Sequence, residues 1–590
     1  MNRAFLSAGC AALALSFAAC SSSEPSPSDE APGGSAGSGT GGSGTGGSSG
    51  GGQSGSAGAG PQGGSAGSVA SSGGSSALGG GAGVGAGGAA AGAVAAGGSA
   101  GSGLLGGAAG LGAEGGSAGV PGGAAGGMPP GGMGGAPTAG AGGAPPMIVE
   151  PAVVTSAQNA FWKEGTLTEV TAGNADVTVN DATTYQTWDG FGGTFNEVGW
   201  AMLQLLTPAE QDRALTLLFG MDGARFAFGR VPIGASDYAL TRYTLDESPA
   251  DYTMANFSVE HDKSNLIPYI QAALAKNPNI RLWASPWTPP TWMKDNGAFD
   301  GGNMKDDAMV LSAHALYLAK FVEEYGKLGI PIEAIHSQNE PGYETRYPSC
   351  LWTPELVNKY IRDYLGPTFE ERKVTAKIYL GTMSNADSGK DGTIISTVTA
   401  DSATMKYVKG FGLQWNMINS ISSLKSLNLP IVQSEHKCGN YPWETSTFNT
   451  TTAPNDYAYG VESWGLIVDW INAGATSYSA WNMVLDRDGQ NSDMMRPWPQ
   501  NALMWVDKTA KTLNVTAAYY VFRHVSEFVD PGAKRVGTSG GNALAFKNPD
   551  GSIVAAMYNS GGAKQAIVSV GGKKLQFDMP SNGWATVNVK

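Results

Sequence analysis

The sequence Ile-Glu-Ala-Ile-His-Ser-Gln-Asn-Glu-Pro at residues 332–341 joins a short apolar run to a polar segment that contains Glu340. A second stretch, Pro-Ile-Val-Gln-Ser-Glu-His at residues 430–436, carries Glu435 at the same place after its own apolar run. Each glutamate therefore lies where a β-strand is expected to end and a loop to begin. The two are 95 residues apart (340 to 435), about the span of three strand–helix units of a (β/α)8 barrel. Active sites of such barrels form at the C-terminal strand ends, so both carboxylates are expected at one site.

Eight short runs rich in Val, Ile, Phe, Tyr or Trp can be counted, as is typical of buried parallel strands. They lie near residues 188–193, 224–231, 280–285, 332–338, 377–382, 408–414, 430–434 and 475–481. Helical patterns separate most of them; Thr207-Pro208-Ala209-Glu210, for example, is a capping box with proline at the first helical position. Alternation of strands and helices predicts a parallel sheet with right-handed crossovers, and eight units predict an α/β fold closed into a TIM barrel.

After about residue 510 the pattern changes to short strands separated by turn signals, which is typical of a β-sandwich. Residues 166–170 and 176–180 precede the barrel, also resemble strands, and could pair with this C-terminal sheet. The predicted domains are N-terminal sandwich strands at 151–186, a catalytic barrel at 187–508 and a C-terminal β-sandwich at 509–590.

Residues 21–150 are predicted to be a disordered linker. Residues 31–147 consist almost entirely of Gly, Ala and Ser with a few Pro, and they hold more than half of the 88 glycines. Such a segment has too little apolar surface to offset the entropy lost on ordering.

Residues 1–20 are typical of a targeting segment. Arg3 supplies a positive start, an apolar core follows at 11–19, and small residues precede Cys20. The segment resembles a bacterial lipoprotein signal with Cys20 as the lipidated N-terminus, and ordinary secretory cleavage nearby is the alternative. Either one predicts export, to the cell envelope with membrane contact through a lipid anchor in the first case and as a secreted protein in the second. No later apolar run is long enough to span a bilayer.

The net charge of −13 belongs mainly to the folded part, because residues 31–147 contribute a single acid, Glu114. An acidic domain is a poor partner for nucleic acid and is compatible with a neutral substrate such as a carbohydrate or a glycolipid.

Two of the four cysteines, Cys350 and Cys438, lie in the folded part, ten and three residues after the two glutamates. If both loops lie on one face of the barrel, the thiols could form a disulfide, which an exported protein permits. No His/Cys spacing matches a zinc pattern, so we expect neither a metal nor another cofactor.

Cutting a glycosidic bond with retention of configuration requires at least two carboxyl groups: one acts as acid/base and the other as nucleophile. We assign Glu340 as acid/base and Glu435 as nucleophile. Asn339, directly before Glu340, can bind the 2-hydroxyl of the sugar, a bond that strengthens as charge develops. Arg230, at the end of the second strand run, could keep the nucleophile ionised through charge-assisted hydrogen bonds.

Trp287, Trp292 and Trp481 lie at predicted strand ends or loop starts, where indole faces could stack on a pyranose ring. Each feature has a plainer alternative. Asn-Glu-Pro is a plausible turn, a single tryptophan is more often part of the core, and the alternative for Arg230 is a bond to a neighbouring carbonyl alone. For His436 we favour a polar niche over contact with the glutamates.

Together these motifs resemble glycoside hydrolase family 30, which includes lysosomal glucosylceramidases and microbial β-1,6-glucanases. The resemblance covers residues 186–590, and the matching segments occur in the order found in the family: 190–193, 230–233, 284–294, 338–341, 347–350, 434–435 and 481–482. The most specific is Ser-Pro-Trp-Thr-Pro-Pro-Thr-Trp within 284–294.

The resemblance implies a (β/α)8 barrel fused to a β-sandwich, and retaining hydrolysis of β-glucosides, glucosylceramide-like or β-1,6-linked, through a covalent glycosyl-enzyme. It implies the same roles for Glu340 and Glu435, and sugar contacts for Glu197, Trp287, Asn339 and Trp481. Residues 414–416 depart from the family, because Gln-Trp-Asn stands where glucosylceramidases have His-Trp-Tyr. Asn416 could still donate a hydrogen bond to the nucleophile.

Two other functions remain open at this point. One is a glycosidase of the same fold that acts on xylan, galactan or fucosides, and the other is a catalytically silent surface protein that binds sugar on the same tryptophans. The presence of both glutamates favours an enzyme.

Overall fold

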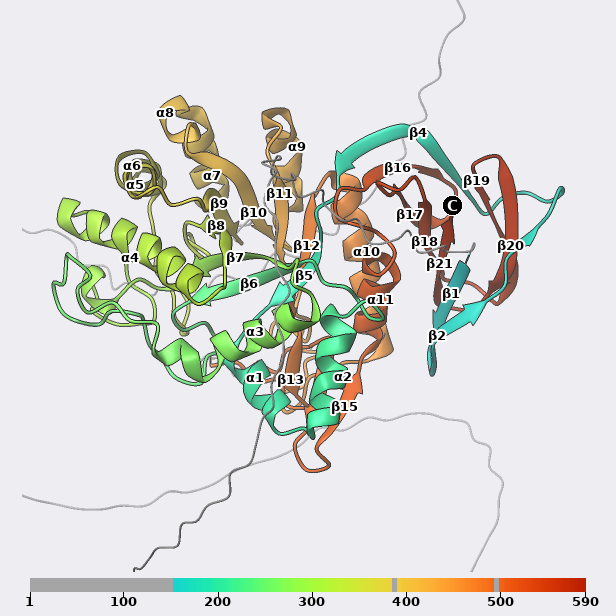
Figure 1. The fold of residues 1–590 in the computed structure, drawn as a ribbon, viewed down its shortest axis with the longest axis horizontal. Coiled ribbons are helices and arrows are strands. Elements are labelled where there is room, and N and C mark those ends of the chain that lie inside the picture. Colours follow the sequence, from blue (N-terminus) through green and yellow to red (C-terminus); the bar gives the residue numbers. More distant parts are fainter. Residues whose placement is uncertain (1–151, 385–389, 493–497) are drawn as a thin grey trace, which may run out of the picture. The chain divides into compact units, whose positions relative to one another are not determined.

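The computed structural model describes residues 152–384, 390–492 and 498–590, all within one compact unit (Figure 1). The predicted signal segment with Cys20 and the predicted linker at 21–150 lie outside the described residues.

Eight parallel strands form a closed barrel in chain order, with the last strand pairing to the first (Figure 1). Each corresponds to one of the eight runs in the sequence, so the predicted barrel is confirmed. The strands are β5 (Gly190–Thr194), β6 (Phe228–Ile233), β7 (Arg281–Pro286), β8 (Ile332–His336), β9 (Lys377–Met383), β10 (Val408–Gln414), β11 (Ile431–Glu435) and β12 (Ser477–Asn482). Glu435 is the last residue of β11, and Glu340 follows the end of β8 by four residues (336 to 340).

Helices follow most of the barrel strands, as the alternating pattern predicts. They begin at local caps: Thr207 accepts a hydrogen bond from Glu210 N, and Asp456 accepts one from Tyr459 N. Among the described helices, none is at once long and apolar enough to cross a membrane. The α-helices are α1 (Glu197–Gln204), α2 (Pro208–Phe219), α3 (Leu266–Lys276), α4 (Ala308–Lys327), α5 (Pro354–Tyr360), α6 (Gly366–Arg372), α7 (Lys390–Ala400), α8 (Ser402–Met405), α9 (Ile421–Leu424), α10 (Tyr457–Ala473) and α11 (Ala517–Ser526).

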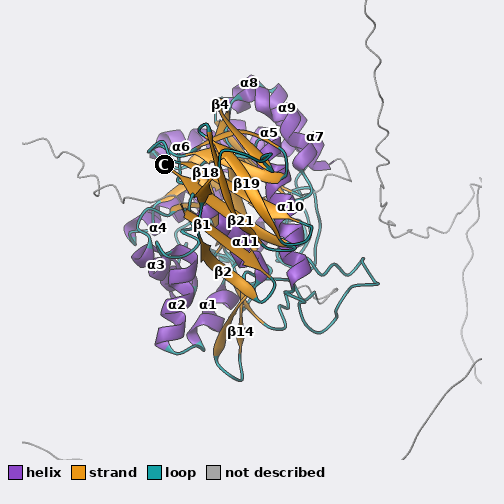
Figure 2. Cartoon of the chain, turned by 90° about the vertical axis from the view of Figure 1, so that its right-hand side faces the viewer, coloured by secondary structure: helices purple, strands orange, loops and turns teal. Residues whose placement is uncertain are grey.

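The ends of the described chain meet in a second, ten-stranded sheet with an apolar core of its own (Figure 2). Antiparallel pairing places Val153 opposite Val587, and the predicted strands before the barrel do join the C-terminal strands. The strand order is β2 (Ala160–Gly165), β1 (Ala152–Ala157), β21 (Gly583–Val589), β18 (Ile553–Asn559), β17 (Asn542–Lys547), β16 (Lys534–Ser539), β4 (Val177–Thr187), β19 (Lys564–Val570), β20 (Lys573–Met579) and β3 (Thr168–Glu169).

The segment between the barrel and this sheet belongs with the barrel, so the C-terminal sandwich begins later than residue 509. β13 (Val484–Asp486), β14 (Met504–Asp507) and β15 (Thr512–Val515) form a separate three-stranded sheet. Phe522 of α11 packs its ring 5.7 Å from Phe191 of β5 and 5.7 Å from Tyr478 of β12. The first strand of the C-terminal part of the sandwich is therefore β16.

Candidate active site

Glu340 lies in a turn that the two neighbouring strands hold in place. Its backbone N–H donates to Thr382 O at 2.9 Å, and that of Asn339 donates to Pro286 O at 2.8 Å. Glu340 adopts a left-handed backbone with φ 49°, which is uncommon for a residue other than glycine and is found at functional sites. The hydroxyl of Tyr347 donates to Glu340 Oε2 at 2.8 Å, which fixes the carboxylate as well as the backbone.

Glu435 is paired with Arg230 of β6. Arg230 Nη1 donates to Glu435 Oε2 at 2.6 Å, with the arginine side chain fully buried and the glutamate side chain 12% exposed. Gln414, the last residue of β10, donates to the same oxygen at 3.3 Å. The strand register explains this contact, because the β10–β11 pairing shifts after Leu413 and places Gln414 opposite Glu435.

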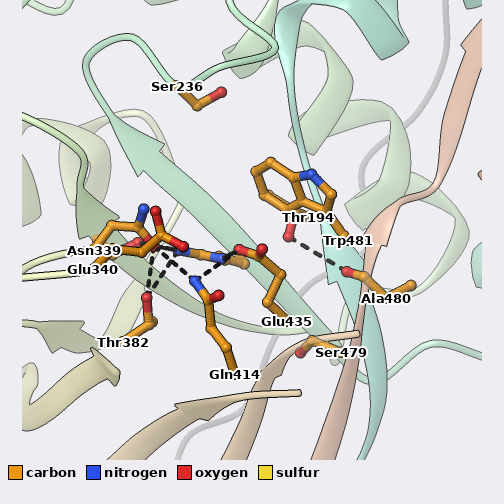
Figure 3. Close-up of polar contacts among 12 residues, drawn as sticks. Thr194, Ser236, Asn339, Glu340, Thr382, Gln414, Glu435, Ser479, Ala480 and Trp481 are labelled. Carbon is orange, nitrogen blue, oxygen red and sulfur yellow. Dashed lines mark hydrogen bonds and ion pairs between the residues drawn. The ribbon is translucent and has the colours of Figure 1, made fainter. Parts of the chain in front are cut away.

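The same guanidinium orients Asn339. Its Nη2 donates to Asn339 Oδ1 at 2.6 Å, and the hydroxyl of Thr382 donates to that oxygen at 2.6 Å. Figure 3 shows Asn339, Glu340, Thr382, Gln414 and Glu435 gathered around this network. With Oδ1 occupied, the amide nitrogen of Asn339 is the group left to donate to a ligand.

Burial raises the pKa of Glu435; the charge of Arg230 opposes that rise and the charge of Glu340 adds to it. Burial also raises the pKa of Glu340, which the Tyr347 hydroxyl and the Arg230 charge lower and the charge of Asp391 raises. Two carboxyls that interact in this way titrate as a pair. Because Arg230 bonds directly to Glu435, the arrangement favours the charge on Glu435 and the proton on Glu340.

Asp237 is a third acid of this site, and the sequence reasoning missed it. It is buried in the loop that follows β6, and burial, then the charges of Glu435 and Glu340, raise its pKa well above the usual range. Its position four residues after the end of β6 (233 to 237), the strand that carries Arg230, is the signal that could have identified it.

Glu197, expected from the resemblance to contact sugar, is held by protein groups in this structure. Its Oε2 accepts a hydrogen bond from Leu240 N at 2.7 Å, and its Oε1 lies 2.9 Å from His261 Nε2. With both oxygens engaged, Glu197 anchors the loop after β6, whereas Asp237 of that loop lies near the glutamate pair.

Trp287 and Trp481 lie together at the site. Their rings stack at 5.7 Å with an interplanar angle of 25°, and Arg230 Cζ lies 4.3 Å from the centre of the Trp287 ring. Trp481 Nε1 donates to Gln500 Oε1 at 2.9 Å. Trp292 lies elsewhere: its Nε1 donates to Asp246 O, and its ring packs edge-on against Tyr252.

Two other expectations are corrected. Gln414, not Asn416, donates to Glu435, and Asn416 Oδ1 is buried without a hydrogen bond. Cys350 and Cys438 are both free, so the disulfide that the sequence left possible is not formed in this structure. The thiols pack into different apolar clusters, which separates them although both follow strands of one barrel.

His436 occupies a polar niche, as favoured from the sequence. Its Nδ1 lies 2.6 Å from the Tyr478 hydroxyl and its Nε2 lies 3.0 Å from Ser463 Oγ. These contacts turn the ring towards α10 rather than towards the glutamate pair.

Comparison with known proteins gives matches over most of the described residues. A family model described as the glycosyl hydrolase family 30 TIM-barrel domain matches residues 188–529, and one described as the family 30 beta sandwich domain matches residues 532–587. The chain is 28% identical to the lysosomal acid glucosylceramidase of Mus musculus over 397 residues, which are 64% of this chain and 75% of that protein. It is 24% identical over 454 residues to endo-1,6-beta-D-glucanase neg1 of Aspergillus fumigatus, covering 70% of this chain and 87% of that protein. The crystal structure of SrfJ from Salmonella typhimurium shares the fold, with a TM-score of 0.67, 23% identity, and coverage of 75% of this chain and 99% of that one.

Proposed function

This chain belongs to glycosyl hydrolase family 30, whose enzymes are retaining glycosidases, and on that premise we propose that it hydrolyses β-glucosides with Glu435 as nucleophile and Glu340 as acid/base. The observation that carries the proposal is the pair of carboxyls beside one guanidinium, with Glu340 buried, Glu435 12% exposed, and Arg230 bonded directly to Glu435 at 2.6 Å. A binding protein would gain nothing from placing a second acid, Glu340, where its charge raises the pKa of Glu435.

The first step would use both carboxyls at once. Glu435 attacks the anomeric carbon while the protonated Glu340 gives its proton to the leaving oxygen, and a covalent glycosyl-enzyme forms. In the second step Glu340, now ionised, takes a proton from water, and that water displaces Glu435 from the sugar. Arg230 supports the first step because its charge stabilises the ionised form of Glu435.

The remaining groups would bind the sugar. Asn339, held at Oδ1 by Arg230 and Thr382, is positioned to donate its amide N–H to the 2-hydroxyl. Asp237 can accept hydrogen bonds from hydroxyls farther from the cleaved bond. The stacked rings of Trp287 and Trp481 offer apolar surface for the C–H face of a pyranose.

A β-glucoside is the proposed substrate because both relatives named above, a glucosylceramidase and an endo-1,6-β-glucanase, act by their names on glucose-containing substrates, and the second on a β-linked one. A panel of aryl β-glycosides of glucose, galactose, xylose and fucose tests this choice. We expect the highest kcat/KM on the glucoside. A clear preference for the xyloside, galactoside or fucoside would show that the enzyme is a different glycosidase of the same fold.

Azide rescue tests the two roles. With E435A, azide should replace the missing nucleophile and give an α-glycosyl azide from an activated aryl β-glucoside. With E340A, azide should attack the glycosyl-enzyme and give a β-glycosyl azide. Products of the opposite configuration would reverse the assignment, and unchanged turnover by E435A would refute it.

We also propose that the enzyme is exported and held at a membrane by a lipid on Cys20, which the sequence of residues 1–20 supports. Expression of the full chain in bacteria fed labelled fatty acid tests this. Label should appear on the wild-type protein and be absent from C20S. Unlabelled wild-type protein, or label retained by C20S, would contradict the lipid anchor.

A further inference from the structure

Trp443 is the one tryptophan among the large apolar side chains that the described part of the chain exposes. Its side chain is 40% exposed, and it lies in the loop between β11 and α10, eight residues after Glu435 (435 to 443). The four residues that follow, 444–447, are polar and exposed. An exposed indole within a polar loop at the C-terminal end of the barrel needs a physical reason.

The ring of Trp443 packs against other aromatic rings. One face stacks on buried Tyr441 at 4.5 Å with an interplanar angle of 24°, and Trp498 meets it nearly edge-on at 5.3 Å. Lys437 Nζ lies 4.8 Å from the centre of the Tyr441 ring and is itself paired with Glu462 at 2.5 Å. These contacts support the indole on two sides, and the residue remains 40% exposed.

The rings that pack against Trp443 connect it to the glutamate pair. Tyr441 packs 5.5 Å from Trp415, whose backbone N–H donates to Glu435 O at 3.1 Å. Tyr441 also belongs to the apolar cluster that contains Trp287 and Trp481. Trp443 is therefore two ring contacts, of 4.5 and 5.5 Å, from a residue bonded to the proposed nucleophile.

We propose that the exposed part of the Trp443 indole is a binding subsite for a sugar unit beyond the cleaved bond, so that the natural substrate is a β-linked gluco-oligosaccharide or glucan. The inference rests on the proposed β-glucosidase function. Trp287 and Trp481 are buried and can hold the sugar whose bond is cut. Trp443 is exposed and packs through Tyr441 on the same cluster, so it can contact a further sugar unit.

The surroundings of Trp443 favour a sugar over a lipid chain. A pyranose presents C–H groups on its face and hydroxyls at its edge, which suits an indole face bordered by polar side chains. A ceramide tail would need a contiguous apolar surface. Here the loop continues with Glu444, Thr445, Ser446 and Thr447, all exposed.

The test compares three kinds of substrate in the wild-type enzyme, W443A and W443F. The substrates are an aryl β-glucoside, a series of gluco-oligosaccharides with β-1,2, β-1,3, β-1,4 and β-1,6 linkages, and glucosylceramide in detergent micelles. We expect W443A to lose about five- to tenfold in kcat/KM on the oligosaccharide that the wild type prefers, as one aromatic stacking contact would give. Its kcat/KM on the aryl glucoside should stay within about twofold of wild type. W443F, which keeps a ring, should recover most of the loss.

A matched control is Y185A, which removes another exposed aromatic ring, 49% exposed, on β4 of the other sheet. Y185A should change neither the kcat/KM on the aryl glucoside nor the kcat/KM on the oligosaccharide. Equal losses of W443A on aryl glucoside and oligosaccharide, or no loss on the oligosaccharide, would overturn the subsite while leaving the proposed function intact. A loss confined to glucosylceramide, or a wild type that cleaves only the aryl glucoside and glucosylceramide, would overturn it in favour of a lipid contact. A wild type with no β-glucosidase activity would refute the proposed function itself.

Discussion

Arg230 Nη1 donates a 2.6 Å hydrogen bond to Glu435 Oε2, and this ion pair joins β6 to the end of β11. The guanidinium has no exposed surface, so its charge acts on the carboxylate with little screening by water. This relationship sets the charge state on which the proposed chemistry depends.

Replacing Arg230 should therefore change both rate and pH dependence. R230K keeps a positive charge but lacks the planar guanidinium that bonds to Glu435 and Asn339 at the same time. We therefore expect kcat/KM to fall roughly 100-fold, as the loss of a charge-assisted hydrogen bond would give. R230Q also removes the charge that lowers the pKa of Glu435. Because the nucleophile must be ionised, the acid limb of the kcat/KM profile should move to higher pH.

R281Q is the control for this experiment. Arg281 starts β7, at the opposite end of the strand from the site, and pairs with Glu333 at 2.5 Å. Its loss should leave the acid limb where it is in the wild type. An acid limb in R230Q that stays in place or moves to lower pH would contradict the role given to Arg230.

The buried carboxyl of Glu340 should destabilise the fold when it is ionised. Its pKa is raised in the folded protein by burial, so the penalty is present above that pKa and is relieved as the pH falls and the group binds a proton. E340Q should thus raise Tm relative to wild type at pH 8, by about 2 °C, with a smaller difference at pH 4.5. Scanning calorimetry at both pH values measures the effect.

E164Q, which alters an exposed carboxyl on β2, should leave Tm unchanged at both pH values. A lower Tm for E340Q at pH 8, or a gain that grows as the pH falls, would show that Glu340 is not a destabilising buried acid.

We expect the hydroxyl of Tyr347 to adjust the pKa of Glu340, the proposed acid/base. Its hydroxyl donates to Glu340 Oε2 at 2.8 Å and lowers the pKa of that carboxyl. In Y347F the pKa of Glu340 should rise, and since the acid must be protonated, the basic limb of the kcat/KM profile should move to higher pH. We expect kcat/KM to fall about tenfold, and further for aryl glucosides with poor leaving groups, which depend most on the proton. A basic limb that moves to lower pH would rule out this role.

The thiols offer a simple chemical check of the structure. Cys350 and Cys438 are both buried and free. A protein spanning residues 152–590 should therefore give two titratable thiols per chain after denaturation without reductant, and reductant should not change its Tm. No titratable thiol under those conditions would mean that the two cysteines are bridged after all.

The barrel could be predicted from the sequence because its strands are buried on both sides. Short runs such as 377–382 and 408–414 are apolar enough to be recognised one by one. Eight such strands that alternate with helices predict a closed (β/α)8 barrel. β2 escaped prediction because it is mostly exposed, so its sequence, Ala-Phe-Trp-Lys-Glu-Gly, carries little apolar periodicity.

Details of the site depended on geometry that residue types do not reveal. Whether Gln414 or Asn416 meets Glu435 is decided by the register shift after Leu413, which no local pattern indicates. Pairing of Cys350 with Cys438 required Cβ positions that a sequence does not contain. Asp237 was missed because it lies in a loop beyond the strand end, where periodicity gives no signal and only its short distance from the end of β6 could have indicated it.

Covalent trapping tests the central claim most directly. The enzyme would be incubated with a 2-deoxy-2-fluoro β-glucoside that carries a good leaving group, and the adduct located by mass spectrometry of its peptides. We expect one fluoroglucosyl group per chain, attached to the peptide at Glu435. An adduct on any other residue, or none while an aryl β-glucoside is still being hydrolysed, would contradict a retaining mechanism through Glu435.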